Sequence, residues 1–187
     1  CLVEPLAVAV HGFAMVNPRP NSRILIIGAG SIGLAAVAVA QEVTPHVHIV
    51  ARHDAQKAAA ERLGARLDPD GGTYDIVVDC AGSNDSISLA AQVARPRGKI
   101  LVLINYWGGV AMPNIDIAAK EISVHTASMY CQNGVLRDID AAAIILAKRP
   151  EVVPALITHR IPLDAAPDAF RIAGDRAAGA IKVTLNP

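Results

Sequence analysis

The stretch Ser22–Leu34, SRILIIGAGSIGL, joins an apolar strand to a glycine-rich turn and then to an apolar helix. Its glycines have the spacing G-x-G-x-x-G. Gly28 permits the sharp turn, Gly30 lets the backbone approach phosphate groups because it carries no Cβ, and Gly33 lets the helix pack closely against the strand. The positive N-terminus of the helix then faces the anion. The stretch therefore predicts a pyrophosphate site for a dinucleotide, in preference to a purely structural glycine turn.

Further cofactor contacts follow from the rule that ligands of open α/β sheets bind beyond the carboxyl ends of the parallel strands. Two more runs, YDIVVDC and KILVLI, are mostly apolar and show no helical spacing, which is typical of buried parallel strands. The predicted contacts at the start of the first helix and after these strands are Ser31, Ile32, Cys80, Ala81, Gly82 and Ile104. We interpret Cys80 as a small buried wall and not as a reactive thiol.

Size and composition limit the possible classes of protein. The 187 residues suit one large domain, or one domain with part of another. Hydrophobic residues make up 52% of the chain and aromatic residues only 3%, which favours alanine-rich helices packed closely on a sheet. The formal net charge of +0 gives no long-range field toward nucleic acid, and no apolar run reaches the ~20 residues of a membrane span. We expect neither nucleic acid nor a membrane as a partner.

The cysteines are Cys1, Cys80 and Cys131, widely spaced and without a C-x-x-C pair. Isolated reduced thiols in a cytoplasmic protein are favoured over a disulfide framework or a zinc knuckle. Because the chain begins at Cys1 and not at methionine, we expect it to be the later part of a longer protein. A targeting signal would then lie outside these residues.

Strand and helix patterns alternate through the first 130 residues, after an apolar segment of helical spacing over Cys1–Val16. Asp54 is a candidate N-cap, and Gly64 follows the end of the same helix. The alternation implies right-handed crossovers in a doubly wound parallel sheet, an α/β Rossmann fold. The predicted strands are Arg23–Ile27, His46–Val50, Ala65–Leu67, Tyr74–Cys80, Lys99–Ile104 and Ser123–Ala127. The predicted helices are Ser31–Val43, Asp54–Leu63 and Ser86–Ala94.

The pattern changes after Tyr130. A helix over Leu136–Lys148 is followed by a strand in ALITHR, a helix in LDAAPDAFRIA and a final strand in GAIKVTLNP. This tail extends beyond a minimal nucleotide-binding unit, so we expect it to serve another part of the protein.

Six segments carry a family resemblance through their order along the chain: EPLAVAVHGF, IIGAGSIGLAA, ERLGA, RPRGKILVL, KEISV and ITHRIPLDAAPDAF. Together they resemble the medium-chain dehydrogenase/reductase superfamily, in its zinc-dependent alcohol and polyol branch of sorbitol and threonine dehydrogenase-like enzymes. The resemblance covers essentially the whole chain. It implies an oxidoreductase that acts on a small-molecule alcohol or carbonyl substrate with NAD or NADP, in two lobes.

The resemblance also divides the chain. Residues 1–20 would link from a catalytic lobe, 21–150 would form the Rossmann domain, and 151–187 would return to the catalytic lobe, which is otherwise missing here. Family members commonly form dimers or tetramers through edge strands, here near Val110–Met112 or Ser123–Ala127. A homo-oligomer is therefore implied.

Glu4 is the candidate catalytic and metal-binding residue. The resemblance places it close to a catalytic zinc, either as a ligand or as a partner of the metal-bound water. From the residues alone, an exposed carboxylate at a helix N-terminus with Pro5 in the first turn is an open alternative. The family's N-terminal cysteine and histidine ligands are absent from this chain. The resemblance thus implies zinc in the full-length enzyme, and little activity for this chain alone.

The choice of cofactor depends on the end of the second strand, where NAD sites usually have Asp or Glu. Here that position is Ala51, followed by Arg52. A small residue leaves room for a 2′-phosphate and a guanidinium can bind it, whereas a carboxylate would repel it. His53, Gln56 and Lys57 are possible additional donors. The pattern favours NADP over NAD, with a solvent-exposed Arg52 and Asp54 on the ribose as the alternative.

Other histidines fit a metal site less well. His11 is interpreted as a packed or interface histidine, and His46 and His48 alternate along a strand without a nearby cysteine or carboxylate in the sequence. Three other functions stay open: a zinc-free quinone reductase of the same superfamily, a non-catalytic nucleotide-sensing domain and, more weakly, a methyltransferase. The glutamate in EPLAVAV argues against the quinone reductase. The EPLAVAV segment and the returning tail together argue against the sensing domain.

Overall fold

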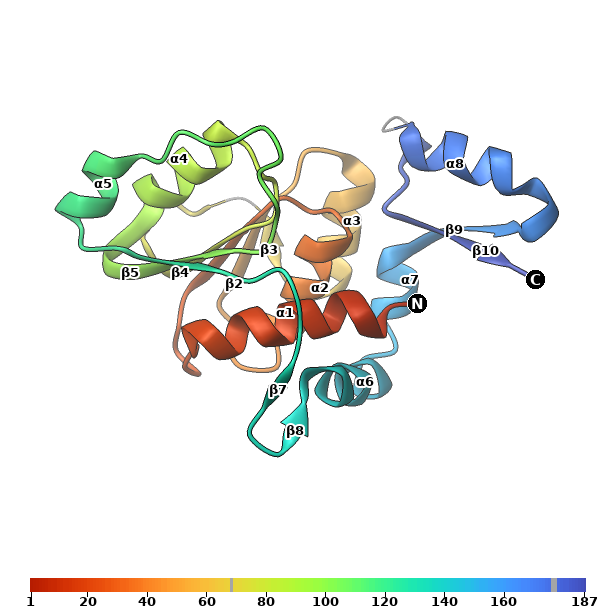
Figure 1. Cartoon of the computed structure of the whole chain (residues 1–187), viewed down its shortest axis with the longest axis horizontal. Coiled ribbons are helices and arrows are strands. Elements are labelled where there is room, and N and C mark those ends of the chain that lie inside the picture. The colour runs from red at the N-terminus through yellow and green to blue at the C-terminus, as the bar shows by residue number, and fades with distance from the viewer. Residues whose placement is uncertain (68, 176–177) are drawn as a thin grey trace.

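A six-stranded parallel sheet forms the centre of the molecule, which a computed structural model describes for residues 1–67, 69–175 and 178–187 (Figure 1). The strand order is β3-β2-β1-β4-β5-β6. This 3-2-1-4-5-6 order is that of doubly wound dinucleotide-binding domains, and it confirms the predicted fold class. The strands are β1 (Ile24–Ile27), β2 (Val47–Val50), β3 (Arg66–Leu67), β4 (Tyr74–Asp79), β5 (Ala94–Val102) and β6 (Ser123–Thr126).

Helices cover both faces of the sheet, because successive side chains of a strand point to opposite faces. On β1, Ile24 and Ile26 pack into one apolar cluster, and Leu25 and Ile27 pack into the other. The first cluster lies under α1 (Val3–Val16), α2 (Ser31–Ala40), α3 (Asp54–Arg62), α6 (Asp138–Lys148) and α7 (Val152–Leu156). The second lies under α4 (Asn84–Val93) and α5 (Asn114–Ala119).

The helix α2 is buried on all sides, since every residue from Gly33 to Ala40 is buried. The sheet lies on one side of α2, and α1 and α7 pack on others. Its sequence alternates alanine, valine and leucine without a polar stripe, and small side chains let the neighbouring helices approach closely. This burial fixes the helix whose N-terminus follows the glycine turn.

Several element ends differ from the predictions. The helix α2 ends at Ala40 and not at Val43, and α3 begins at Asp54 with His53 as its N-cap, so the N-cap assigned to Asp54 was wrong. Gly64 does have the positive φ of a residue that follows a helix. The strand β5 begins five residues before the predicted start at Lys99, because Ala94 pairs with Tyr74 across a register shift, and it ends at Val102.

Short elements after β5 were not predicted. A hairpin of β7 (Gln132–Asn133) and β8 (Leu136–Arg137) occupies the predicted start of the helix at Leu136, which begins at Asp138 instead. The helices α5 and α7 were also missed, and α7 includes the first two residues of the predicted strand ALITHR. These elements are only two to six residues long, too short for periodicity to reveal.

The C-terminal segment forms a separate unit beside the main sheet (Figure 1). It contains β9 (Ile157–Pro162), η1 (Leu163–Ala165), α8 (Ala166–Gly174) and β10 (Lys182–Asn186). The strands β9 and β10 pair in parallel with each other and not with the six-stranded sheet. Among the described residues, no helix has the length and apolar character needed to cross a membrane.

Candidate functional site

A cleft of about 580 Å³ opens at the carboxyl ends of β1, β2 and β4, within the ~300–1,000 Å³ typical of ligand sites. We call it the cofactor cleft. The ends of the three strands are held together there, because Gly28 N–H donates to Val50 O and Cys80 N–H donates to Ile27 O. The residues that line it are Ile27, Gly28, Ala29, Gly30, Val50, Arg52, His53, Gln56, Cys80, Ala81, Ser83, Asp85, Ser86, Leu89 and Ala180.

The three glycines of the turn differ in how much space a Cβ would have. Gly28 has φ +100°, and a Cβ there would also lie 3.1 Å from the backbone nitrogen of Ala81. A Cβ at Gly33 would lie 1.8 Å from the carbonyl oxygen of Gly28, so the start of α2 packs directly on the turn. A Cβ at Gly30 would meet nothing within 4 Å. The space above Gly30 is therefore open to the cleft. A diphosphate needs such a space to approach the backbone closely.

The helix α2 starts at this open position. Gly30 is its N-cap, with φ −79° and ψ −171°, and its carbonyl accepts the first helical hydrogen bond, from Leu34 N–H. The N–H groups of Ser31, Ile32 and Gly33 lie in the first turn, where a helix provides no internal acceptors. They are positioned to bind an anion above Gly30.

The basic residues of the cleft come from the segment directly after β2. Ala51 is buried at the strand end, and the exposed Arg52 and His53 line the cleft with Gln56. Gln56 also accepts a hydrogen bond from His53 N–H at 3.4 Å, which ties the side chain to the start of α3. Lys57, a predicted contact, is not among the lining residues and pairs with Asp54 at 3.5 Å.

The opposite wall follows β4. Cys80 and Ala81, two of the predicted cofactor contacts, line the cleft, while Gly82 has φ +69° and is not among the lining residues. A Cβ at Gly82 would come within 2.9 Å of Ile104, so these two residues pack on each other and neither lines the cleft. Burial, with the charge of Asp79 beside it, raises the pKa of the Cys80 thiol, which therefore stays protonated near neutral pH.

Asp79, at the end of β4, organises this wall, and the sequence analysis missed it. The carboxylate is fully buried and accepts N–H bonds from Ala81 at 2.9 Å and Gly82 at 3.1 Å. Its other oxygen accepts the hydroxyls of Ser86 and Tyr106 at 2.9 and 2.5 Å. Burial and the bond to Asp79 raise the pKa of the Tyr106 phenol, which keeps it a donor. An acidic residue inside the apolar run YDIVVDC was the available signal.

Other lining residues come from parts of the chain that sequence reasoning did not connect with the site. Ser83 caps α4, since Ser86 N–H donates to its hydroxyl at 3.1 Å, and Asp85 gives the cleft a carboxylate. Ala180 reaches the cleft from the C-terminal segment, where a Cβ on Gly179 would lie 3.5 Å from Ala55 of α3. The cleft is therefore closed on one side by residues far along the chain.

Glu4 lies away from any group of metal ligands. It is exposed in the first turn of α1, and Pro5 follows it. Across the described ranges, the one set of three or more clustered His, Cys, Asp or Glu side chains does not contain Glu4. The described residues therefore do not form a zinc site around Glu4.

Comparison with known proteins places the fold and the cleft in context. The chain is 29% identical over 207 residues to sorbitol dehydrogenase of Arabidopsis thaliana, covering 99% of this chain and 55% of that protein. It is 27% identical over 208 residues to L-arabinitol 4-dehydrogenase of Hypocrea jecorina, covering 98% and 53%. The chain thus spans about half the length of the curated relatives it matches. No protein-family model matches it.

Solved structures agree in fold. A protein of Sinorhizobium meliloti described as a zinc-binding dehydrogenase, bound to NADP, superposes with a TM-score of 0.82 at 27% identity, over 99% of this chain and 58% of that one. An Escherichia coli protein described as a short chain alcohol dehydrogenase, complexed with NADH, gives a TM-score of 0.84 at 22% identity, over 100% of this chain and 58% of that one. At that lower identity the second likeness shows the fold alone.

Proposed function

We propose that this chain, a homologue of the polyol dehydrogenases in the zinc-dependent branch of the medium-chain dehydrogenase/reductase superfamily, is the cofactor-binding portion of an oxidoreductase. The whole protein would transfer a hydride between NADP(H) and an alcohol or carbonyl substrate. The observation that carries the proposal is the cofactor cleft, in which open space above Gly30 meets the N-terminus of α2 at the carboxyl ends of the strands.

The residues of the chain bind and orient the cofactor. The first-turn N–H groups of α2 would hold the diphosphate, and Gly30 allows its close approach. Ala81 and the Cys80 side chain would form a neutral wall, kept in place by the carboxylate of Asp79. When bound, the nicotinamide supplies or accepts the hydride. This chain would contribute by positioning the cofactor and by excluding water from it.

Selection of NADP over NAD would depend on Ala51 and Arg52. The guanidinium of Arg52 lines the cleft beside the small, uncharged Ala51, so a 2′-phosphate meets a cation and no carboxylate at the end of β2. Asp85 also lines the cleft, from α4, and a negative charge there favours the unphosphorylated ribose. A binding experiment measures whether the cation of Arg52 or the carboxylate of Asp85 has the larger effect on the choice of cofactor.

The test is a parallel titration of the chain with NADPH and NADH, followed by the fluorescence of the bound reduced nicotinamide. We expect tighter binding of NADPH, and a loss of roughly 10–100-fold in NADPH affinity in Arg52→Ala, because a charge-assisted hydrogen bond is removed. Ala51→Asp combined with Arg52→Ala should shift the preference toward NADH.

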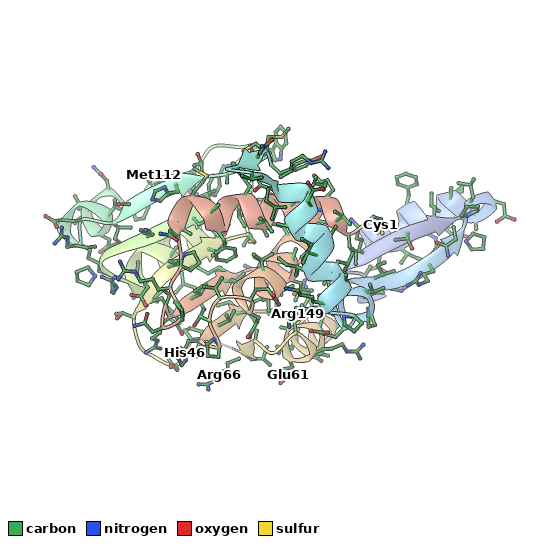
Figure 2. The ribbon with its side chains drawn as sticks, turned by 90° about the horizontal axis from the view of Figure 1, so that it is seen from below. Cys1, His46, Glu61, Arg66, Met112 and Arg149 are labelled. Atoms are coloured by element: carbon green, nitrogen blue, oxygen red, sulfur yellow. The ribbon has the colours of Figure 1, made fainter. Side chains whose placement is uncertain are left out.

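Arg66→Ala is the matched control, since Arg66 is an exposed arginine on β3 (labelled in Figure 2) and is not among the residues that line the cleft. Its NADPH affinity should equal that of the unchanged chain. Binding of NADH at least as tight as that of NADPH would contradict the NADP assignment. Binding of neither coenzyme would contradict the proposed function itself.

The remaining parts of the proposal concern the whole protein. Residues 1–20 would connect to a catalytic lobe and 151–187 would return to it, with 21–150 as the Rossmann domain. Glu4 would face the zinc of that lobe, whose other ligands come from elsewhere in the intact protein. A cytoplasmic homo-oligomer fits the isolated cysteines and the unpaired edge of β6, while 110–112 form no strand.

A further inference from the structure

A second group of polar side chains lies away from the cofactor cleft, where α1 meets the β7–β8 hairpin and the start of α6 (Figure 1). His11 Nδ1 is 3.0 Å from Asp138 Oδ2 and 3.4 Å from Cys131 Sγ. The three ligand atoms all lie within 4.8 Å of one another, and no other such group occurs in the described part of the chain. We call it the His11–Cys131–Asp138 group.

The ligand atoms of this group lie about as far apart as those around one small cation, and the nitrogen–sulfur distance fits best. Zinc bonds of about 2.0–2.1 Å to nitrogen and 2.3 Å to sulfur, at tetrahedral angles, put those two ligand atoms about 3.5 Å apart. The observed Nδ1 to Sγ distance is 3.4 Å. The Nδ1 to Oδ2 distance of 3.0 Å is slightly shorter than a shared metal requires, and a small side-chain rotation corrects it.

The contacts of His11 with Cys131 and Asp138 are both made by Nδ1, so the three side chains do not form a proton relay. A catalytic Cys–His–Asp arrangement uses both ring nitrogens of the histidine, one toward the thiol and the other toward the carboxylate. Here the thiol and the carboxylate both approach Nδ1. This geometry does not form a proton relay from the thiol to the carboxylate. Instead, the three ligand atoms surround a single position.

Burial also suits a bound ion. Asp138 is buried, with Cys131 N–H donating to its Oδ2 at 2.8 Å, so its carboxylate is held in place. The His11 side chain is 23% exposed and Cys131 is exposed, which leaves an entry path and room for a water ligand. Three protein ligands and one open position are a common arrangement for zinc.

We propose that His11, Cys131 and Asp138 bind a divalent transition-metal ion of the zinc type, independently of the cofactor cleft and of Glu4. Binding releases the thiol proton of Cys131 to solvent. The proton on His11 Nδ1 is also lost to solvent and Nε2 carries the ring proton instead, so Nδ1 and Asp138 Oδ2 both present lone pairs to the ion. The ion joins α1 to residues 120 and 127 positions further along the chain. Its role is to fasten the β7–β8 hairpin and α6 to α1.

The experiment titrates the metal-free chain with Co²⁺, whose thiolate charge-transfer absorption reports sulfur coordination, and then displaces Co²⁺ with Zn²⁺. We expect one equivalent bound, a charge-transfer band, and a Tm that rises with Zn²⁺. Cys131→Ser should lose the band, and His11→Gln should lose at least tenfold in Co²⁺ affinity.

Cys1→Ser is the matched control, because Cys1 is the other exposed thiol among the described residues. Figure 2 places Cys1 at the start of α1, beside the C-terminal unit. Its variant should keep the band and the Tm increase. Loss of the band in Cys1→Ser, or its retention in Cys131→Ser, would overturn the proposal, as would a chain that binds no Co²⁺. NADPH titration of Cys131→Ser should match the unchanged chain, which separates this proposal from the cofactor proposal.

Discussion

At the scale of single residues, three glycines in one motif serve three different purposes. Gly28 is needed for its positive φ, and Gly33 is needed because any side chain would collide with the turn. Gly30 has ordinary backbone angles and free space around it, so the protein itself does not require glycine there. Only a ligand that fills that space gives a reason for glycine at this position, which makes Gly30 the most direct probe of the cofactor.

Gly30→Ala should separate binding from folding. Because its Cβ meets no protein atom within 4 Å, the Tm should change by no more than about 2 °C, corresponding to a free-energy change of about 0.5 kcal/mol. The same Cβ would occupy the diphosphate position, so NADPH affinity should fall at least tenfold, by about 1.4 kcal/mol.

Thermal melting and NADPH titration of the same sample measure both effects. Gly174→Ala is the control, since a Cβ there also meets nothing within 4 Å, but Gly174 lies at the end of α8, outside the cleft. Unchanged NADPH affinity in Gly30→Ala would show that the coenzyme does not bind over this turn.

At the scale of elements, the stability of the fold depends on hydrogen bonds made to the ends of its helices. Arg149, after α6, donates to the carbonyls of Ala38 at 2.8 Å and Leu63 at 3.0 Å, at the C-terminal ends of α2 and α3 (Figure 2). Its third partner is Glu151, at 2.7 Å, and this bond lowers the pKa of the Glu151 carboxyl. One side chain thus connects three helices that the sequence shows only as separate segments.

Arg149→Ala should destabilise the fold by roughly 2–3 kcal/mol, because two helix-end carbonyls lose a charged donor in a mostly buried position. Urea unfolding followed by circular dichroism measures the free energy of unfolding. Arg171→Ala provides the comparison, since its ion pair with Asp168 is exposed and should contribute no more than about 0.5 kcal/mol. Equal losses in the two variants would mean that Arg149 has no bridging role.

At the scale of the whole molecule, the cleft is assembled from distant parts of the chain. The turn after β1, the end of β2 and the loop after β4 form its walls, and Ala180 reaches it from the C-terminal segment. A ligand held by all four regions stabilises the folded state as a whole, because the unfolded chain has no such site.

NADPH should therefore raise the Tm. At a free concentration of about 100 times its Kd, ligand linkage contributes about 2.7 kcal/mol, which corresponds to an increase of roughly 5–10 °C for a chain of this size. Differential scanning calorimetry at several NADPH concentrations measures it. The increase should be smaller in Arg52→Ala at the same NADPH concentration, and a Tm independent of NADPH would contradict binding in the cleft.

The local sequence determined the class of fold and the place of the cofactor turn. Alternating apolar runs specify parallel strands and covering helices, and the G-x-G-x-x-G motif lies within six residues, so both can be recognised without tertiary information. The start of β5, the N-cap of α3 and the β7–β8 hairpin escaped this reading, because pairing with distant strands and short turns decided them.

Tertiary structure alone decided which polar side chains meet. Asp79 is joined to Tyr106, Arg149 to two helix ends, and His11 to a thiol and a carboxylate more than a hundred residues away. From sequence, His11 was a packed or interface histidine, because its partners leave no local spacing to recognise. The physical reason is that periodicity reports only how a segment contacts its own neighbours, whereas ligand sites form where segments remote in the chain are packed together by the core.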